Sequence, residues 1–387
     1  MARFLLSFTF LTILLLVPCP SDAHPAHDPP GKTFAIDPLH SSSVEARERF
    51  AQDTRTDLLS PRTTGVGALR FRLLHVAHSI LPQEALLALE RAHGGFAVDR
   101  REGRGEIYFA LRGAGIIRIA PTLDSAELID TPDVMRYRTL HNTSLWYRND
   151  DQTFLTFPSV DGASVFTTTT DGALVHTLNT PSPAASFGPP VVNTYFNEGK
   201  PLIPTDVVYR NDMLYVTTGY SKLDYVLTAR IESTDPFRAR WGRLAFGGRG
   251  TAPGQFGTGH GITLAPDGET LVVSDRENSE LDEFTLDGRY LRTTTLPKGS
   301  RPCDVDFAAG YALVACLKGP DPELGAPIYI LKDREIVSTI MPKEDLGLLN
   351  FESVHNAVLV QRDGRLYIIA LAWHPGDFAI LEQVLDE

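Results

Sequence analysis

The sequence predicts an all-β fold, a six-bladed β-propeller that follows an N-terminal signal peptide and an extended arm. Short apolar strands alternate with polar turns from about residue 93 onward, and the pattern recurs about every forty to sixty residues, as expected of propeller blades. Helix-forming stretches are scarce, and the clearest one is 82–92. Together, the repeat and the scarcity of helix favour a ring of antiparallel sheets.

The first residues have the pattern of a secretory signal peptide. Arg3 is followed by a mainly apolar run, Phe4 to Val17, and the small residues Ser21 and Ala23 suit a cleavage site. The apolar run is shorter than the ~20 residues that a membrane span needs. We therefore expect cleavage near Ala23, removal of residues 1–23, and a secreted or periplasmic protein without a membrane span. A retained N-terminal anchor is the alternative.

Residues 24–64 precede the predicted propeller. They are rich in proline, serine, histidine and charged residues and show no sustained apolar period, which indicates an extended or mobile arm. The propeller is expected to occupy residues 65–387. Its one predicted helix, "PQEALLALERA" at 82–92, begins with a proline and is followed by Gly94, and we expect it to pack outside the first blade.

Composition limits the partners that the protein can have. The net charge of −12 argues against a nucleic-acid partner. We expect a monomer that acts on a small-molecule or peptide substrate. Cys303 and Cys316 lie in one apolar segment, where they can pair across two strands or remain buried thiols. Two cysteines do not make a disulfide framework.

The repeat is clearest between Gly261 and Leu296, "GITLAPDGETLVVSDRENSELDEFTLDGRYLRTTTL". Two Asp-Gly pairs separate apolar or alternating runs there, which is the strongest short-range signal for a β-hairpin. Five further copies, less regular, complete six blades of three or four strands each. A pair of β-sandwiches is the alternative fold, but it does not explain why the segments resemble one another.

One position of the repeat carries a pattern of its own. The residue at the start of the innermost strand is histidine or aspartate in five successive blades: His141, Asp206, His260, Asp304 and His355. Innermost strands line the channel of a propeller, so the three histidines of alternate blades should converge on its axis. Three imidazoles with a fourth direction left open are typical of a catalytic zinc site. Taken singly, each histidine can instead be a polar cap on a backbone group.

Several segments resemble a known family. The segment Pro253 to Phe284, "PGQFGTGHGITLAPDGETLVVSDRENSELDEF", is similar to the NHL-repeat propeller of the peptidyl-α-hydroxyglycine α-amidating lyases. The segments "IPTDVVYRNDMLYVTTGYSKLDYV", "VHNAVLVQRDGRLYIIAL" and "LHNTSLWYRNDDQTFLTF" resemble other blades of that family. The resemblance spans about residues 93–387 in the same order, and it is most specific between Gly254 and Asn278.

The resemblance implies a reaction and the residues that perform it. The reaction splits a peptidyl-α-hydroxyglycine into a peptide amide and glyoxylate. A Zn²⁺ ion polarises the substrate oxygen, a tyrosine takes its proton and arginines bind the substrate carboxylate in a planar fork. The implied roles fall on zinc ligands His141, His260 and His355, catalytic Tyr220 in "TTGYSK", active-site Arg276 in "SDREN" and a second arginine, Arg112, in "FALRGAG".

The sequence also departs from the family. Ser221 follows Tyr220 where the family has a corner cysteine, so the corresponding disulfide must be absent. The family holds a structural Ca²⁺ with an aspartate just after the last zinc histidine. Asn356 stands at that position here, and its neutral amide is a weaker ligand, which weakens the case for calcium.

Two other functions fit the same fold. A non-catalytic NHL propeller can serve as a rigid platform that binds peptide, protein or glycan on one face, because a fold does not fix a function. A different metal-dependent hydrolase or lyase, such as a lactonase-like enzyme, is the third possibility. Related propellers of that kind hold calcium with Glu, Asp and Asn side chains rather than with three histidines.

Overall fold

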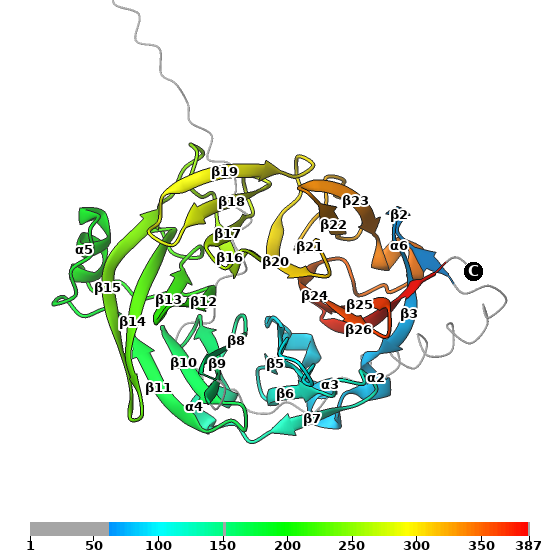
Figure 1. The fold of residues 1–387 in the computed structure, drawn as a ribbon, viewed down its shortest axis with the longest axis horizontal. Helices are drawn as coiled ribbons and strands as arrows, with labels where there is room; N and C mark the ends of the chain where they lie inside the picture. The colour runs from blue at the N-terminus through cyan, green and yellow to red at the C-terminus, as the bar shows by residue number, and fades with distance from the viewer. Residues whose placement is uncertain (1–61, 150–151, 386–387) are drawn as a thin grey trace, which may run out of the picture. The chain divides into compact units, whose positions relative to one another are not determined.

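The structure is a computed structural model that describes residues 62–149 and 152–385. It confirms the predicted all-β fold: six antiparallel sheets stand around a central axis (Figure 1). The predicted signal peptide, and the predicted arm as far as residue 61, lie outside the described residues. The last two residues of that arm form strand β1 (Thr63–Thr64).

The first four blades are each built from four consecutive strands, and the innermost strand comes first in the chain. The first blade consists of β4 (Ala97–Val98), β5 (Ile107–Leu111), β6 (Gly115–Ile119) and β7 (Ala126–Ile129), and the second of β8 (Ser144–Asn149), β9 (Gln152–Ser159), β10 (Ser164–Thr169) and β11 (Leu174–Asn179). The third blade consists of β12 (Asp206–Arg210), β13 (Met213–Thr217), β14 (Tyr225–Thr234) and β15 (Phe237–Gly247). The fourth consists of β16 (Gly259–Leu264), β17 (Thr270–Asp275), β18 (Glu280–Thr285) and β19 (Tyr290–Thr295).

The last two blades combine strands from both ends of the described chain. The fifth adds β2 (Val66–Gly67) to β20 (Pro302–Ala308), β21 (Tyr311–Cys316), β22 (Ile328–Lys332) and β23 (Glu335–Ile340). The sixth adds β1 and β3 (Arg70–Val76) to β24 (Val354–Arg362), β25 (Arg365–Ala372) and β26 (Asp377–Val384). Pairing of β26 with β3 closes the ring, which leaves neither strand as an open edge on that side. The repeat had not revealed this closure.

The hairpin between β16 and β17 forms at the first predicted Asp-Gly turn. The Asp267 carboxylate accepts the backbone N–H groups of Glu269 and Thr270 at 2.8 and 2.9 Å. Gly268 has φ +68°, a left-handed conformation that glycine adopts without the steric cost that a side chain brings. The sequence pattern therefore fixes the register of this pair of strands.

The described helices are short. The predicted helix is present as α3 followed by a 3₁₀ turn, but it covers the gap between the sixth and first blades rather than the first blade alone. Ala85 and Leu89 pack in one cluster with Phe109 of the first blade and Phe378 of the sixth. None of these helices is long and apolar enough to cross a membrane. Their bounds are α2 (Ala77–Ile80), α3 (Gln83–Ala88), η1 (Leu89–Arg91), α4 (Asp133–Arg136), α5 (Pro190–Asn197) and α6 (Pro342–Leu346).

The hydrophobic core is divided among the blade interfaces. A separate cluster of buried apolar side chains fills the space between each pair of neighbouring blades. Alternate residues of a strand face opposite neighbours, so both faces of each blade are apolar. This explains why the middle strands of most blades are continuously apolar, as in "IYFAL" at 107–111 and "LYIIALA" at 366–372.

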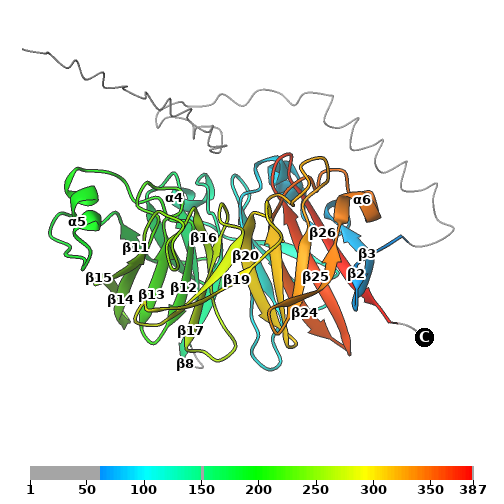
Figure 2. The same cartoon turned by 90° about the horizontal axis from the view of Figure 1, so that it is seen from above.

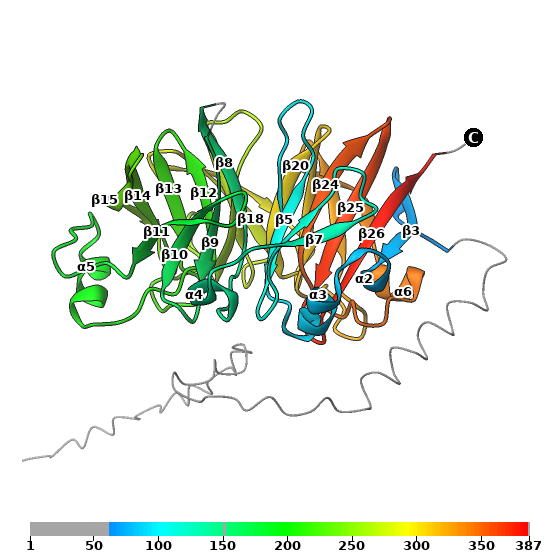
Figure 3. The same cartoon turned by 90° about the horizontal axis from the view of Figure 1, so that it is seen from below.

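One mouth of the propeller carries the helices α3, α4 and α6 (Figures 2 and 3). Because α4 leads into β8, the innermost strands begin at this mouth and end at the opposite one. Residues at the starts of β8, β16 and β24 therefore meet near the helix-bearing mouth. The turns after β16 and β20 lie at the far mouth.

Candidate metal centre

The three predicted histidines lie at the starts of alternate innermost strands. His141 precedes β8 by three residues, and His260 and His355 are the second residues of β16 and β24. All three side chains are fully buried. Asp206 begins β12 and Asp304 lies at the start of β20, as the repeat register predicts.

Each of these histidines is held by a backbone carbonyl of the next blade. The Nδ1–H of His260 donates to the Cys303 carbonyl at 2.7 Å, and that of His355 donates to the Gly94 carbonyl at 2.9 Å. The Nδ1–H of His141 donates to the Thr205 carbonyl. Since a carbonyl can only accept, these bonds fix the proton on Nδ1 and leave each Nε2 with a lone pair.

The Nε2 atoms converge. The Nε2 of His141 is 3.1 Å from that of His260 and 3.2 Å from that of His355. With the protons on Nδ1, these contacts bring acceptor lone pairs together, and the nearby Tyr220 hydroxyl has one proton to donate to His141 or His260. Such an arrangement is unfavourable by itself and becomes favourable around a cation, so the donor set fits a metal such as Zn²⁺.

The electrostatic surroundings keep the rings of His141 and His260 neutral. Burial, with the neighbouring histidines adding to it, holds the pKa of His141 well below its ordinary value. Burial and the Arg276 guanidinium do the same to the pKa of His260. Neutral imidazole is the form that binds a metal ion, so no proton has to be displaced from Nε2 at neutral pH.

Tyr220 and Arg276 lie beside the histidines, although they come from the corners of different blades. The Tyr220 hydroxyl is 2.9 Å from His260 Nε2 and 3.1 Å from His141 Nε2. Arg276 Nη1 donates to the Tyr220 oxygen at 3.0 Å, and its Nη2 donates to Cys303 Sγ at 3.0 Å. Burial raises the pKa of the Tyr220 phenol, while the Arg276 charge acts to lower it.

The structure adds a fourth histidine, which the sequence analysis missed. His93, between η1 and β4, is partly buried, and its ring centroid lies 4.6 Å from that of His141 and 4.8 Å from that of His355. His93, His141 and His355 each offer a ring nitrogen within 4.8 Å of the others. The signal was present in "HGGFAV", where a histidine precedes the innermost strand of the first blade.

Arg112 occupies the corner of the first blade that corresponds to the place of Arg276 in the fourth. Its side chain is 42% exposed, and its ion pair is with Asp161, at 3.9 Å. Among the described residues, no hydrogen bond links Arg112 to Tyr220 or to the histidines. The structure therefore brings Tyr220 and Arg276 into the cluster but leaves Arg112 at its rim.

A second layer of polar groups lies next to the histidines. Asn356 Nδ2 donates to Asp304 at 2.6 Å, and its Oδ1 accepts the Phe96 N–H at 3.0 Å. Burial raises the pKa of Asp206 to about 7, and burial together with the Asp206 charge raises that of Asp304. Asn356 thus serves as a hydrogen-bond bridge between the first, fifth and sixth blades.

The two cysteines of the propeller are buried free thiols. Cys303 has two contacts in the histidine cluster, because its carbonyl accepts from His260 and its sulfur accepts from Arg276. Of the two possibilities that the sequence left open, the structure has the unpaired one.

Comparisons with known proteins support no closer assignment than the fold. No protein-family model matches the sequence, and no curated protein is significantly similar to it. Among solved structures, a catalytically inactive variant of virginiamycin B lyase from Staphylococcus aureus with quinupristin is 12% identical, with 82% of this chain and 100% of that chain covered and a TM-score of 0.49.

Two other structures are similar to a comparable degree. A streptogramin B lyase is 13% identical, with 84% of this chain and 98% of that chain covered and a TM-score of 0.46. A nidogen/laminin complex gives 11% identity, 74% and 95% coverage and a TM-score of 0.45. At these identities the likeness concerns fold alone.

Proposed function

We propose that the protein is a secreted, zinc-dependent lyase that cleaves a carbinolamide into an amide and glyoxylate, as the amidating lyases do. One observation carries the proposal: three buried histidines present converging Nε2 atoms, with the Tyr220 hydroxyl and Arg276 within hydrogen-bond reach of one another. The sequence resemblance at "PGQFGTGHGITLAPDGETLVVSDREN" supports the same reaction.

The residues of the cluster fit a zinc ion. His141, His260 and His355 would hold it through Nε2, because their Nδ1 atoms are already bound to carbonyls. When bound, Zn²⁺ supplies Lewis acidity that makes a hydroxyl oxygen of the substrate easier to deprotonate.

The remaining chemistry falls to Tyr220 and Arg276. The Tyr220 oxygen takes the proton of the substrate hydroxyl as the C–N bond breaks; the electron pair goes to the amide nitrogen, which then accepts a proton. Arg276 keeps a positive charge against the Tyr220 oxygen and so favours its ionised form. A guanidinium that is almost fully buried also suits recognition of the substrate carboxylate.

Two measurements test the proposal, first the zinc content of the protein and then its release of glyoxylate. Purified wild-type protein should contain roughly one zinc per chain, and His260→Ala should lose most of it, since a ligand substitution removes one of three donors. Wild-type protein should release glyoxylate from α-hydroxyhippurate. Absence of zinc from the wild type after incubation with zinc and dialysis contradicts the metal site. If the wild type binds zinc but releases no glyoxylate, the proposed lyase activity is contradicted.

One observation favours a different function, the binding platform. His93 lies against His141 and His355 on the side where a lyase needs an open position, and its Nε2 is 3.4 Å from the Tyr220 hydroxyl. A metal held by four imidazoles is closed to substrate and acts as a structural cross-link. The propeller would then offer a rigid face for a partner.

X-ray absorption of the zinc-loaded protein separates the two functions. A lyase should show three nitrogen ligands and one oxygen, whereas a platform should show four nitrogens. His93→Ala is the matched variant. If the protein is a lyase, His93→Ala should leave the spectrum unchanged, with three nitrogen ligands. If it is a platform, the variant should lower the number of nitrogen ligands from four to three.

A further inference from the structure

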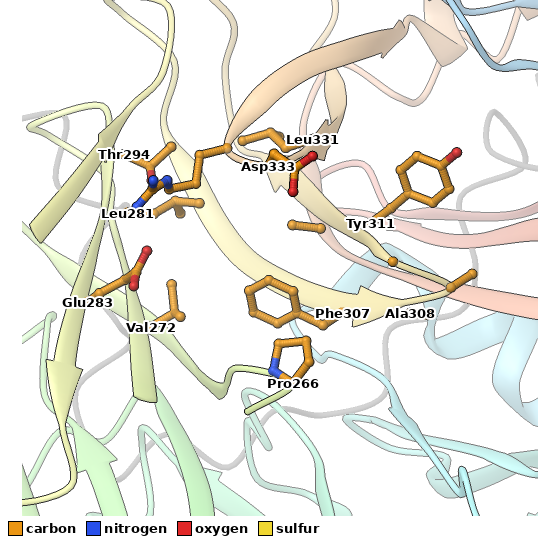
Figure 4. A pocket seen from close by; sticks show the side chains of 14 residues that line it. Pro266, Val272, Leu281, Glu283, Thr294, Phe307, Ala308, Tyr311, Leu331 and Asp333 are labelled. Atoms are coloured by element: carbon orange, nitrogen blue, oxygen red, sulfur yellow. The ribbon is translucent and has the colours of Figure 1, made fainter. Parts of the chain in front are cut away.

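A cavity of about 460 Å³ lies between the fourth and fifth blades (Figure 4). Pro266, in the turn after β16, lines it, as do Ala308 to Tyr311, which span the turn between β20 and β21. The cavity therefore opens at the mouth opposite the histidines and is separate from the metal centre. Its volume is in the range of small-molecule sites, roughly 300 to 1,000 Å³.

The walls of the cavity are apolar. Val272 and Leu281 face it from the fourth blade, and Phe307 and Leu331 face it from the fifth (Figure 4). The space exists because the hairpin between β20 and β21 carries small residues, Ala308 to Gly310 followed by Ala312, where bulkier side chains would fill it. Val272, Leu281 and Leu331 belong to the buried core between the two blades, so they form the floor of the cavity, whereas Phe307 is half-buried at its side. A ligand gains free energy by covering the apolar surface that these side chains leave accessible.

A carboxylate is set into this apolar wall. Glu283 is only 9% exposed, and Arg292 donates from Nε at 2.8 Å and from Nη2 at 2.7 Å, both to the same oxygen, Oε2. The Glu283 carboxylate is directed toward the space between the blades, and Asp333 points its carboxylate into it from the other wall (Figure 4). A carboxylate removed from water gains from a further hydrogen-bond donor.

The charged groups around the space favour a cation. Arg334 also lines the cavity, and Asp267 and Arg292 line the hollow that adjoins it. The two hollows together therefore have three carboxylates, Glu283, Asp333 and Asp267, against two guanidinium groups. The excess is negative, and an anionic ligand would have to approach the inward-facing carboxylate of Glu283.

We propose that this cavity binds a small organic ammonium ion. Its apolar body lies between Leu281 and Phe307, and its N–H groups donate to the Glu283 carboxylate. The aromatic faces of Phe307 and Tyr311 suit both an apolar body and a neighbouring cation. The proposal is independent of the metal centre and of the reaction proposed for it.

Ligand-observed NMR on the full chain, with 2-phenylethylamine and 2-phenylethanol as probes, tests the charge requirement. The two molecules share a body and differ in the ammonium group, so the amine should bind at least about tenfold more tightly than the alcohol. Equal affinity for the two probes, or no binding of the amine, overturns the proposal.

Three variants locate the binding. Glu283→Gln should weaken amine binding about tenfold and leave the alcohol unchanged. Arg292→Gln, the matched control, breaks the same ion pair but keeps the carboxylate, so amine binding should persist or strengthen. Ala312→Leu should fill the space and abolish binding of both probes. Binding that survives in Ala312→Leu, or that falls equally in the Glu283 and Arg292 variants with their thermal unfolding unchanged, contradicts the proposal.

Discussion

Tyr220 is the residue of the histidine cluster on which burial and a neighbouring positive charge act in opposite directions. Its oxygen lies within hydrogen-bond distance of His141 and His260, and Arg276 donates to the same atom. Burial favours the neutral phenol and the guanidinium favours the phenolate. Burial is the larger of the two effects and the pKa of the phenol is raised. In the proposed lyase the charge of a bound metal ion would act together with that of Arg276 to favour the phenolate that takes the proton.

Replacing Tyr220 by phenylalanine should separate catalysis from metal binding. Tyr220→Phe removes the hydroxyl that moves the proton, so kcat for glyoxylate release should fall by about 10²- to 10⁴-fold. The zinc content should stay the same, because the histidines and their carbonyl partners are untouched. Tyr147→Phe is the control, since that side chain is exposed on the second blade. An unchanged kcat in Tyr220→Phe would remove Tyr220 from the mechanism.

Some residues of this centre could be predicted from the sequence and others could not. The repeat register was enough to bring His141, His260 and His355 together, because each follows from its place at a strand start. His93 was missed because the start of the first blade's innermost strand was not aligned with the other five, although a histidine precedes that strand as well. The carbonyls that hold the histidines carry no sequence signal, since every residue has one.

The element that completes the ring is β3, from the start of the described chain. Phe71 in this strand is fully buried and packs in the cluster between the fifth and sixth blades, with Leu359 and Leu381. Its pairing with β26 joins residues that are about 310 positions apart in the chain. The repeat was recognised only from about residue 93 onward, and a local pattern says nothing about pairing over such a distance, which is why the closure was not predicted.

Truncation of Phe71 should destabilise the whole ring. Phe71→Ala leaves a cavity at a blade interface, and the free energy of unfolding should fall by about 3 to 5 kcal/mol. Leu74→Ala in the same strand is the matched control, because Leu74 is 37% exposed, and its loss should stay below about 1 kcal/mol. Urea unfolding measures both. Equal losses in the two variants would mean that β3 does not contribute through its buried face.

The whole molecule has a net charge of −12, and several of its carboxyl groups are buried near the third and fourth blades. Burial raises the pKa of Asp224 to about 7 and that of Asp282 to about 6. A carboxyl whose folded pKa lies above its unfolded value binds a proton more tightly in the folded state. Its contribution to stability is therefore present at low pH and is lost as the pH rises.

Asp224 should account for a measurable part of this loss. Between pH 5 and 8 the folded protein must ionise a carboxyl that the unfolded chain has already ionised, so Asp224 should lower the free energy of unfolding by on the order of 2 kcal/mol. Asp224→Asn keeps an acceptor for the Gly259 N–H, which lies 2.8 Å from Oδ1, but cannot titrate. Urea unfolding at both pH values should therefore show a smaller decrease in the variant.

Arg249→Gln should have the opposite effect to Asp224→Asn on the pH dependence of stability. The Arg249 guanidinium lies 3.7 Å from Asp224 Oδ2, and its positive charge lowers the pKa of that carboxyl. Without it, the loss of stability between pH 5 and 8 should become larger. If the wild type and both variants lose stability in parallel, Asp224 is not the group responsible.

The alternation of histidine and carbonyl around the axis makes the propeller a threefold set of blade pairs. In each pair one blade presents the imidazole and the next holds it by a main-chain oxygen, supplied by residues as different as Gly94, Thr205 and Cys303. Because the acceptor is a main-chain oxygen, the residue that supplies it can change its side chain without loss of the hydrogen bond. The histidine of each pair cannot be replaced in this way. We therefore expect the carbonyl position to vary among related sequences while the histidine position stays the same.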